Sequence, residues 1–372
     1  MEVKYSYLEQ QFADPDPYLN DIRDLARSGD FTLGAAVKEF EERFAGLCGL
    51  PYAVGVGSGT DALALSLKAL GVGPGDEVIT TPNTFVATVG AIVMTGARPV
   101  FVDNNREYTI DADQIEQAIT PRTRAIMPVH LTGNPAEMPA IMEIAGRHNL
   151  AVVEDAAQAV LASIDGKPVG SWGAAAGFSL HPLKNLNVWG DGGVIVTRSP
   201  DLWEKLRLMR NHGLGTRDEV VMFGHNSRLD SLQAVVANRL IDQVHCITER
   251  RIAHAKRFDE GFAGLEGHVI LPPRRPGVKQ VFHTYVIRAE DRDALVSYLS
   301  ASGIEAKVHY PIPLHLQKAA RYLGYQAGDF PVCEEHCRSI ISLPVHQYLT
   351  SEQVDCVIDR VREFYLGRNY GG

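Results

Sequence analysis

The sequence predicts an α/β protein with a mainly parallel sheet, because strand-like and helix-like segments alternate through its first half. Seven strand-like segments are apolar throughout, which is typical of strands that are covered on both faces. They comprise residues 53–58, 76–81, 98–103, 124–130, 151–156, 175–181 and 192–198. Interleaved strands and helices indicate parallel strands joined by right-handed crossovers.

Helical segments near these strands carry apolar stripes. One stripe follows Gly59 and another precedes the first strand, with spacings of three and four residues; the positions are Leu63, Leu67 and Leu70, and Val37, Phe40, Phe44 and Leu47. Only turn residues and a short loop separate segments 175–181 and 192–198. We therefore expect these last two strands to pair antiparallel.

A chain of 372 residues exceeds what one hydrophobic core usually serves, so two domains are expected. The larger domain takes residues 1–245 and includes an N-terminal helical segment. A helix over 227–245, with Ser227 and Asp230 as a capping box, ends it. A smaller C-terminal α+β domain takes residues 246–372.

The smaller domain begins with a charged helical stretch at 247–262. Strand-like segments follow at 281–288 and 304–311, on either side of a helical one. The last helix begins near Thr350 and Gln353, whose spacing fits a capping box.

Composition excludes several classes of protein. A net charge of −9 with no block of Lys or Arg argues against a surface for nucleic acid or anionic membranes. No run of about 18 apolar residues is present, and the N-terminal residues lack the pattern of a secretory signal. Five scattered cysteines fit reduced thiols better than a disulfide framework. We expect a cytoplasmic protein.

One cluster of possible metal ligands lies near the C-terminus. Cys333, His336 and Cys337 share a helical face, but no fourth ligand is near them in the sequence. A packed helix explains these residues better than zinc, so no metal is predicted.

A glycine-rich turn at 55–61 joins the first strand to a helix. Such a turn presents backbone N–H groups and a helix N-terminus to an anion, usually a phosphate. A dinucleotide site would need an acid at the end of the second strand. Asp76 and Glu77 lie at its beginning, so Gly59 and Thr60 are better interpreted as holding a monophosphate.

Lys184 and Asp155 are the central candidates for catalysis. Asp155 ends a strand and Lys184 lies on a turn flanked by glycine. A lysine that forms a Schiff base and an acid that protonates the pyridine nitrogen are what a pyridoxal phosphate (PLP) enzyme needs. Each has a structural alternative, since Asp155 also suits a helix N-cap and a loop lysine is usually on the surface.

Other candidates lie at the same edge of the predicted sheet. Phe85 is placed to stack on a planar cofactor, although a single aromatic is more often part of the core. Gln158 follows Asp155, and Ser179 precedes Lys184 and can bind phosphate. His181 has either a structural role or a role in proton transfer. Ligands bind at the carboxyl edge of open α/β sheets, so together these residues favour one cofactor site.

Nine blocks of the chain, in order, resemble the DegT-type sugar aminotransferases of the fold-type I PLP enzymes. They include GSGTDAL (57–63), VEDAAQ (153–158), KNLNVWGDGG (184–193), GHNSRLDSLQA (224–234) and AKVHYPIPLH (306–315). The resemblance implies fold type I and PLP as cofactor. It also implies transfer of nitrogen from glutamate or glutamine to a nucleotide-linked keto sugar, in a homodimer with shared active sites.

The resemblance also implies a role for each matching residue. Lys184 forms the Schiff base, with His181 beside it, and Asp155 pairs with the ring nitrogen. The remaining cofactor contacts are Gly59, Thr60 and Ser179 at the phosphate, Phe85 and Gln158 at the ring, and Asn226 at the phosphate of the neighbouring subunit. The sugar pocket is implied at His309, Tyr310 and His315.

Two other functions remain open from the sequence. Related dehydratases carry histidine where Lys184 stands, so lysine favours amino transfer over a sugar dehydratase or another PLP lyase. A non-catalytic regulatory protein of the same fold is the second alternative. The block at 184–193 resembles enzymes of 3-keto more than 4-keto sugars.

Overall fold

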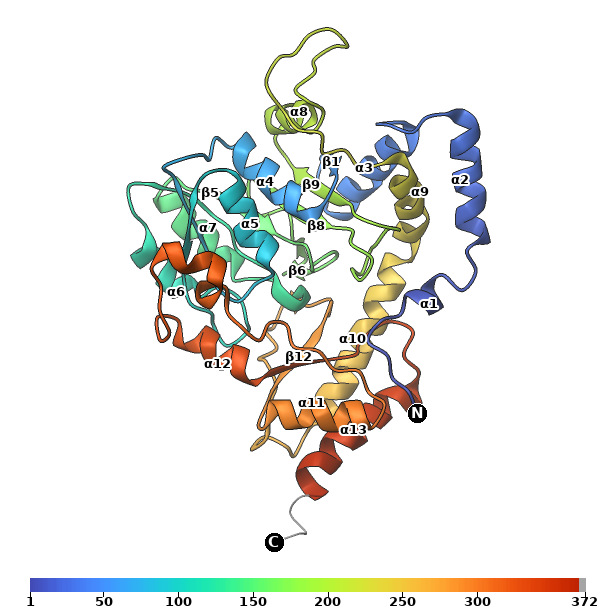
Figure 1. Ribbon diagram of the computed structural model, residues 1–372, viewed down its shortest axis with the longest axis vertical. Coiled ribbons are helices and arrows are strands. Elements are labelled where there is room, and N and C mark those ends of the chain that lie inside the picture. Colours follow the sequence, from blue (N-terminus) through green and yellow to red (C-terminus); the bar gives the residue numbers. More distant parts are fainter. Residues whose placement is uncertain (368–372) are drawn as a thin grey trace.

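A seven-stranded sheet forms the centre of the protein, which a computed structural model describes for residues 1–367 (Figure 1). The strand order is β1–β9–β8–β5–β4–β2–β3. All seven predicted strands are confirmed, with ends that differ by a few residues. Their bounds are β1 Tyr52–Val56, β2 Glu77–Thr80, β3 Arg98–Phe101, β4 Thr123–Ile126, β5 Ala151–Asp155, β8 Ala175–Ser179 and β9 Gly193–Thr197.

The sheet is parallel except for β9. Parallel pairing joins β3 to β2, β2 to β4, β4 to β5 and β5 to β8. β9 runs antiparallel to both β8 and β1, which confirms the expected antiparallel pair. The segment between β8 and β9 contains no crossover helix, so the chain returns in the opposite direction.

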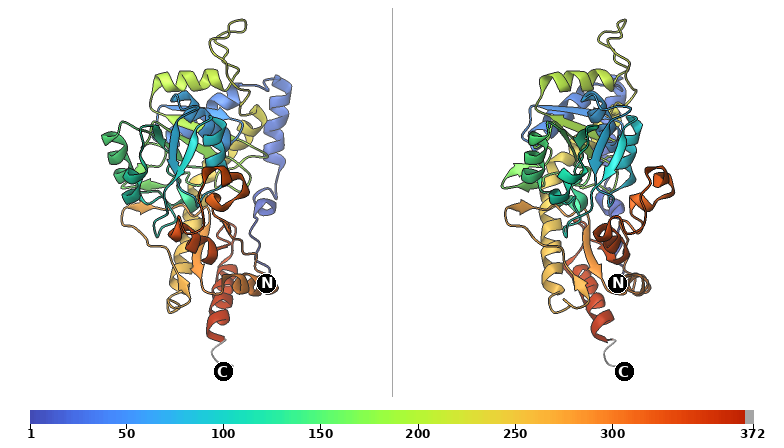
Figure 2. Two further views of the ribbon diagram at one scale, coloured as in Figure 1. Left: turned by 60° about the vertical axis from the view of Figure 1, so that its left-hand side comes forward. Right: turned by 90° about the vertical axis from the view of Figure 1, so that its left-hand side faces the viewer.

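Helices cover both faces of the sheet, and successive strand residues point to opposite layers. Val78 of β2 packs with the helices on one face, whereas its neighbour Ile79 packs with those on the other. The first layer contains α4 Gly59–Ala69, α5 Val86–Met94 and α8 Pro200–Met209; the second contains α3 Ala35–Leu47, α6 Ala112–Ile115, α7 Met138–Arg147 and α9 Ser231–Leu240. Figure 2 shows these layers from two further sides. Burial on both faces explains why the strands are apolar throughout.

A second core lies below the sheet in Figure 1. It packs Val3 of the N-terminal segment against α10 Val244–Gly261, β12 Tyr285–Ala289, α11 Arg292–Ala301, β13 Ile340–Leu343 and α13 Ser351–Leu366. The predicted boundary after residue 245 falls within the first turn of α10 and stays a prediction.

The remaining helices are α1 Leu8–Gln11, α2 Asp16–Ser28 and α12 Pro331–Ser339, with short 3-10 turns at 116–118, 131–133, 241–243, 314–316 and 318–323. Two-residue strands are β6 Ser163–Ile164, β7 Lys167–Pro168, β10 Val269–Ile270 and β11 Val278–Lys279.

The helix expected over 227–245 begins later and is interrupted. α9 begins at Ser231, and a 3-10 turn separates it from α10. Its N-cap Asp230 makes no side-chain cap hydrogen bond, so the predicted capping box is wrong. The Ser227 hydroxyl instead donates to Asp61 Oδ2 at 2.9 Å and accepts from the Gly57 amide at 3.2 Å. These bonds fasten the segment to the start of α4.

The strand expected over 304–311 does not form. Ile304 and Lys307 make isolated bridges to Val3 and Ser342, and the chain then leaves the sheet. An alternating apolar pattern is insufficient for a strand when no continuous edge is available to pair with it.

Cys333 and Cys337 are buried in a small apolar cluster with Phe330 and Leu314. The His336 ring packs edge-on against Tyr108, with 4.8 Å between ring centroids. Within residues 1–367, no group of three or more His, Cys, Asp or Glu side chains is arranged to hold a metal ion. All five cysteines are free.

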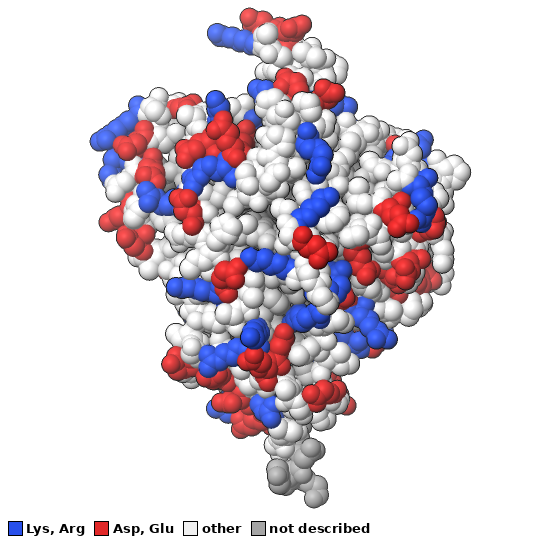
Figure 3. All heavy atoms as spheres, turned by 180° about the vertical axis from the view of Figure 1, so that it is seen from behind, with Lys and Arg blue, Asp and Glu red and all other residues white. Residues whose placement is uncertain are grey.

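Basic and acidic side chains are intermixed on the face shown in Figure 3. Many ion pairs are of the exposed kind, such as Arg207–Glu204 at 2.9 Å and Arg257–Asp355 at 2.6 Å. Exposed pairs contribute only about 0–1 kcal/mol each. Among the helices that the structure describes, none combines the length and apolar character required to cross a bilayer.

The capping box predicted for the last helix is confirmed at Thr350 and Gln353. Replacing Thr350 by Ala should cost about 1 kcal/mol, because the Gln353 amide loses its acceptor. Hydrogen exchange in the first turn of α13 and the urea midpoint measure the loss. Thr350→Ser keeps the hydroxyl and is the control; equal effects of the two variants would contradict the assignment.

Candidate active site

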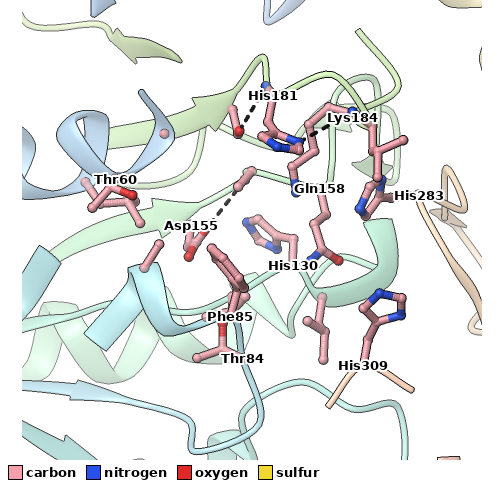
Figure 4. A pocket seen from close by; sticks show the side chains of 18 of the residues that line it. Thr60, Thr84, Phe85, His130, Asp155, Gln158, His181, Lys184, His283 and His309 are labelled. Atoms are coloured by element: carbon pink, nitrogen blue, oxygen red, sulfur yellow. Dashed lines mark hydrogen bonds between the residues drawn. The ribbon is translucent and has the colours of Figure 1, made fainter. Parts of the chain in front are cut away.

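One cavity of about 320 Å³ lies where the parallel strands end, and ten of the predicted site residues line it (Figure 4). Side chains labelled in Figure 4 reach it from several elements: Thr60 from α4, Phe85 from the start of α5, and Asp155 from the end of β5. The predicted residues at the cavity are Gly59, Thr60, Phe85, Asp155, Gln158, Ser179, His181, Lys184, His309 and Tyr310. Parallel strand direction brings these distant segments to one edge.

The Asp155 carboxylate is buried at the end of β5. Its Oδ2 accepts a 2.6 Å hydrogen bond from Thr88, whose hydroxyl lies 2.7 Å from that of Thr84. Burial raises the pKa of Asp155, and this outweighs the opposing effects of Thr88, the Ala157 amide and the Lys184 charge. A positive charge brought against this carboxylate would favour its ionised form. Sequence reasoning missed Thr88, although it stands in the first turn after Phe85.

Lys184 is half-buried and lines the same cavity, on the segment between β8 and β9. Burial lowers the pKa of its amine to about 8, while the Asp155 charge acts in the opposite direction. The Lys184 amide donates to His181 O at 2.8 Å. Its carbonyl accepts from the Tyr7 hydroxyl at 2.9 Å and from Asn187 Nδ2 at 3.1 Å. Tyr7 comes from the N-terminal segment, and nothing in its local sequence indicates this contact.

The N-terminus of α4 and the end of β8 form a narrow cradle at the cavity. A Cβ atom on Gly59 would lie 2.8 Å from the Ser179 Cβ, so glycine permits this close approach. Ser58 caps the helix by accepting from the Asp61 amide at 3.1 Å. The amides of Gly59 and Thr60 lie at the start of the helix, where N–H groups lack intrahelical partners.

Gln158 is held in one orientation at the cavity. Its Oε1 accepts from the Thr132 amide at 2.6 Å. Thr132 has a φ of 63°, a strained conformation for a β-branched residue, and it directs its amide toward Gln158. Since Oε1 is engaged, the NH₂ group of Gln158 remains available as a donor. The Phe85 side chain is half exposed, with its ring centroid 5.9 Å from that of Tyr310.

Three histidines at the cavity have lowered pKa values. Burial lowers the pKa of His309 to about 4 and that of His283 well below its usual value, with the Lys184 charge as the next cause. Burial and Lys184 also lower the pKa of His181. Neutral histidines therefore surround the lysine. His283 was not predicted from the sequence.

Two predicted residues lie away from this cavity. His315 is buried against Glu334, with 3.2 Å between its Nε2 and Glu334 Oε1, and it does not line the cavity. Asn226 is exposed and bridges to Asn211. Both residues belong to the segment between α8 and α9, which forms the loop that projects at the top of Figure 1. Glu77 accepts from Arg122 at 2.6 Å at the amino end of β2, far from any position for a ribose at the carboxyl edge.

The residues present fit pyridoxal phosphate. A phosphate needs N–H and hydroxyl donors with space for close approach, which the cradle at Gly59, Thr60 and Ser179 provides. A pyridinium nitrogen needs a buried acid, and the carbonyl carbon needs a lysine with a lowered pKa; Asp155 and Lys184 meet both needs across one cavity. The molecule is thus a fold-type I PLP enzyme.

The comparisons with known proteins then identify the family. The model of the DegT/DnrJ/EryC1/StrS aminotransferase family matches residues 16–362, and the chain belongs to this family. The chain is 42% identical to the dTDP-3-amino-3,4,6-trideoxy-alpha-D-glucose transaminase of Streptomyces venezuelae, over 98% of this chain and 95% of that protein. It is equally identical to the pleiotropic regulatory protein of Geobacillus stearothermophilus, over 98% and 99% of the two chains.

Solved structures agree with the observed fold. The crystal structure of S. venezuelae DesV in complex with a ketimine intermediate superposes with a TM-score of 0.95, at 42% identity and 98% coverage of both chains. Other relatives have names that likewise refer to position 3 of the sugar. The protein is therefore a transaminase with PLP as its cofactor.

The half-buried lysine predicts a measurable titration. In cofactor-free protein, acetylation of Lys184 should be half-maximal near pH 8, because burial disfavours the charged amine. Asp155→Asn removes a negative charge that favours the ammonium form, so the midpoint should shift to lower pH. Pulse labelling followed by mass spectrometry measures it, with the exposed Lys256 as internal reference. An unchanged or higher midpoint in Asp155→Asn would contradict the coupling.

Proposed function

We propose that this protein transfers an amino group from glutamate or glutamine to a nucleotide-linked keto sugar, with preference for a 3-keto sugar. The observation that carries the proposal is that the half-buried Lys184, with its lowered pKa, and the buried Asp155 line one cavity at the carboxyl edge. The names of the relatives support a sugar acceptor, and several refer to position 3.

Each residue at the cavity has a role in this proposal. Bound PLP supplies an electron sink for the substrate carbanion, and Lys184 is its point of covalent attachment. Asp155, aligned by Thr88, would keep the ring nitrogen protonated. The α4 N-terminus with Gly59, Thr60 and Ser179 would hold the phosphate. Phe85 and Gln158 would contact the ring.

Lys184 moves the proton in the proposed mechanism. Its free amine would take the α-proton of the amino donor and, once protonated, would give a proton back. An amine with a pKa of about 8 is partly deprotonated at neutral pH, whereas an ordinary lysine is almost fully charged. The lowered pKa of Lys184 therefore suits it to act as base and acid in turn. His181, which is close to Lys184, is placed to assist.

The sugar is proposed to bind on the side of His309 and Tyr310. Burial and the Asp155 charge raise the pKa of Tyr310, so its hydroxyl remains a hydrogen-bond donor. His309 Nδ1 lies 2.9 Å from the Ser342 hydroxyl, which fixes the ring. His315 can contribute only through Glu334 and the segment around it, and its role at the sugar stays a prediction.

The acceptor assay tests this function. Enzyme with PLP is incubated with ¹⁵N-labelled glutamate or glutamine and a panel of nucleotide-linked 3-keto and 4-keto sugars, and the products are analysed by mass spectrometry. We expect label in a 3-amino sugar. Lys184→Ala should lower turnover by about 10³-fold or more, since the proton-transfer base is lost, whereas the exposed Lys256→Ala should not.

Other outcomes distinguish the alternatives. A deoxygenated sugar without label would favour a dehydratase, and full activity of Lys184→Ala would contradict the proposal. Failure of purified protein to take up PLP would favour a regulatory role, which the name of the Geobacillus relative suggests for that protein.

We further propose that the active unit is a homodimer in which each subunit completes the site of the other. Asn226 is exposed in the projecting loop, and the side chain of Phe223 in the same loop is 98% exposed. Val86, Val93 and Met94 form an exposed apolar surface on α5, beside the cavity. Such apolar surface supports a protein interface. Asn226 is proposed to reach the cofactor phosphate of the partner.

Mixed dimers test the shared site. Lys184→Ala and Asn226→Ala subunits are each expected to be impaired alone. If Asn226 acts in the partner's site, a mixed dimer contains one site with both native residues, so combining the two variants should restore activity. Mixtures of two Lys184→Ala preparations are the control. No gain over the separate variants would place Asn226 outside the partner's site.

A further inference from the structure

A buried guanidinium without an acidic partner lies next to the main cavity. Arg251, in α10, is 1% exposed. Its Nε donates to Gln347 Oε1 at 3.1 Å, and its Nη1 donates to the carbonyls of Phe282 and His283 at 3.2 and 3.1 Å. Within residues 1–367, neither its hydrogen-bond partners nor the lining of the small cavity beside it include Asp or Glu. A buried charge is normally paired, because its removal from water costs several kcal/mol.

Two donors at this small cavity make no close hydrogen bond within residues 1–367. A guanidinium has five N–H groups, and in the part of the chain described here Arg251 Nη2 has no hydrogen-bond partner. The Tyr5 hydroxyl is also buried and makes no close hydrogen bond among the same residues, and both the Arg251 charge and the Ser342 hydroxyl are near enough to lower its pKa. An unsatisfied buried donor costs about 1–3 kcal/mol, so such groups usually face a water, an ion or a ligand.

The small cavity adjoins the one that contains Lys184. Its volume is about 60 Å³, and a water needs about 10–15 Å³ by this measure, so it holds a group of a few atoms. Four residues line both cavities: Leu183, His283, Thr284 and His309. The Arg251 guanidinium lies 5.1 Å from the centroid of Tyr7, whose hydroxyl donates to Lys184 O at 2.9 Å. The shared lining therefore places Arg251 beside the cavity that contains the Lys184 amine.

We propose that Arg251 Nη2 and the Tyr5 hydroxyl bind a carboxylate of the amino-acid donor while its nitrogen is at Lys184. The inference rests on the proposed aminotransferase function and specifies the donor as an amino acid with a free carboxylate, as opposed to a simple amine. A carboxylate accepts from two donors at once and supplies the negative charge that Arg251 lacks. A sugar ring or a nucleotide exceeds the space.

The surrounding histidines leave Arg251 as the source of positive charge. Burial lowers the pKa of His309 and of His346 to about 4. Both rings are therefore neutral at pH 7. His346 already uses Nε2 at the Lys4 carbonyl, at 3.1 Å. Recognition of the anion thus depends on Arg251 and Tyr5.

Binding of glutarate, a dicarboxylate without an amino group, to the PLP-loaded enzyme tests the proposal independently of turnover. Glutarate should raise the melting temperature of the wild type and bind measurably by calorimetry. Arg251→Lys and Tyr5→Phe should each weaken it by about 10- to 100-fold, since each removes a charge-assisted hydrogen bond. Tyr108→Phe is the matched control, because its hydroxyl is equally buried and unpartnered but lies away from both cavities.

Kinetics then separate this inference from the function on which it rests. Tyr5→Phe should raise the KM for glutamate or glutamine by a similar factor and leave the KM for the keto sugar unchanged. Tyr5→Phe removes a single oxygen, so it remains informative if Arg251→Lys fails to fold. If the enzyme transfers amino groups but Tyr5→Phe binds glutarate as well as the wild type does, the carboxylate site is contradicted and the transferase function is not. Absence of glutarate binding to the wild type also overturns it. If the variants lose glutarate binding and the wild type transfers no amino group, the carboxylate site is supported and the transferase function is contradicted.

Discussion

A half-buried lysine and a buried carboxylate share one cavity at the carboxyl edge of a parallel sheet, and this pair is the constraint on which the rest of the structure depends. Burial disfavours the charged form of each group, so Lys184 has a lowered pKa and Asp155 a raised one. The two charges partly compensate each other, which makes the pair tolerable without a cofactor. A cationic ring near both groups would favour the ionised form of Asp155 and the neutral form of Lys184. These are the protonation states that amino transfer requires.

Two distant parts of the chain hold this pair in place. Thr88 from the first turn of α5 fixes one oxygen of Asp155 at 2.6 Å. Tyr7 from the N-terminal segment fixes the backbone of Lys184 at 2.9 Å. The same Tyr7 ring lies beside Arg251 of α10, so the N-terminal segment connects the cofactor cavity to the small polar cavity. The site is therefore built by the packing of the segment 1–7 as much as by the sheet.

The parts of the site that the sequence predicted are those that follow directly from strand ends. Asp155 ends an apolar run and Gly59 begins a helix after another, so parallel topology alone places both at one edge. The capping box at Ser227 was wrong because the same hydroxyl has a tertiary partner, Asp61, that local reasoning does not include. The strand expected at 304–311 was wrong because pairing needs an available edge, and only isolated bridges form there.

Apolar periodicity was sufficient to predict the α/β sheet and its antiparallel β9, and the strand-end acid and the glycine-flanked lysine pointed to Asp155 and Lys184, both of which line the cavity. These features are local, and hydrophobic burial gives them one consistent arrangement. The contacts of Tyr7, Thr132 and Arg251 were decided only by the tertiary structure. Each joins residues that are far apart in sequence and carries no periodic signal, because a single buried hydrogen bond or charge depends on which surfaces meet when the chain folds.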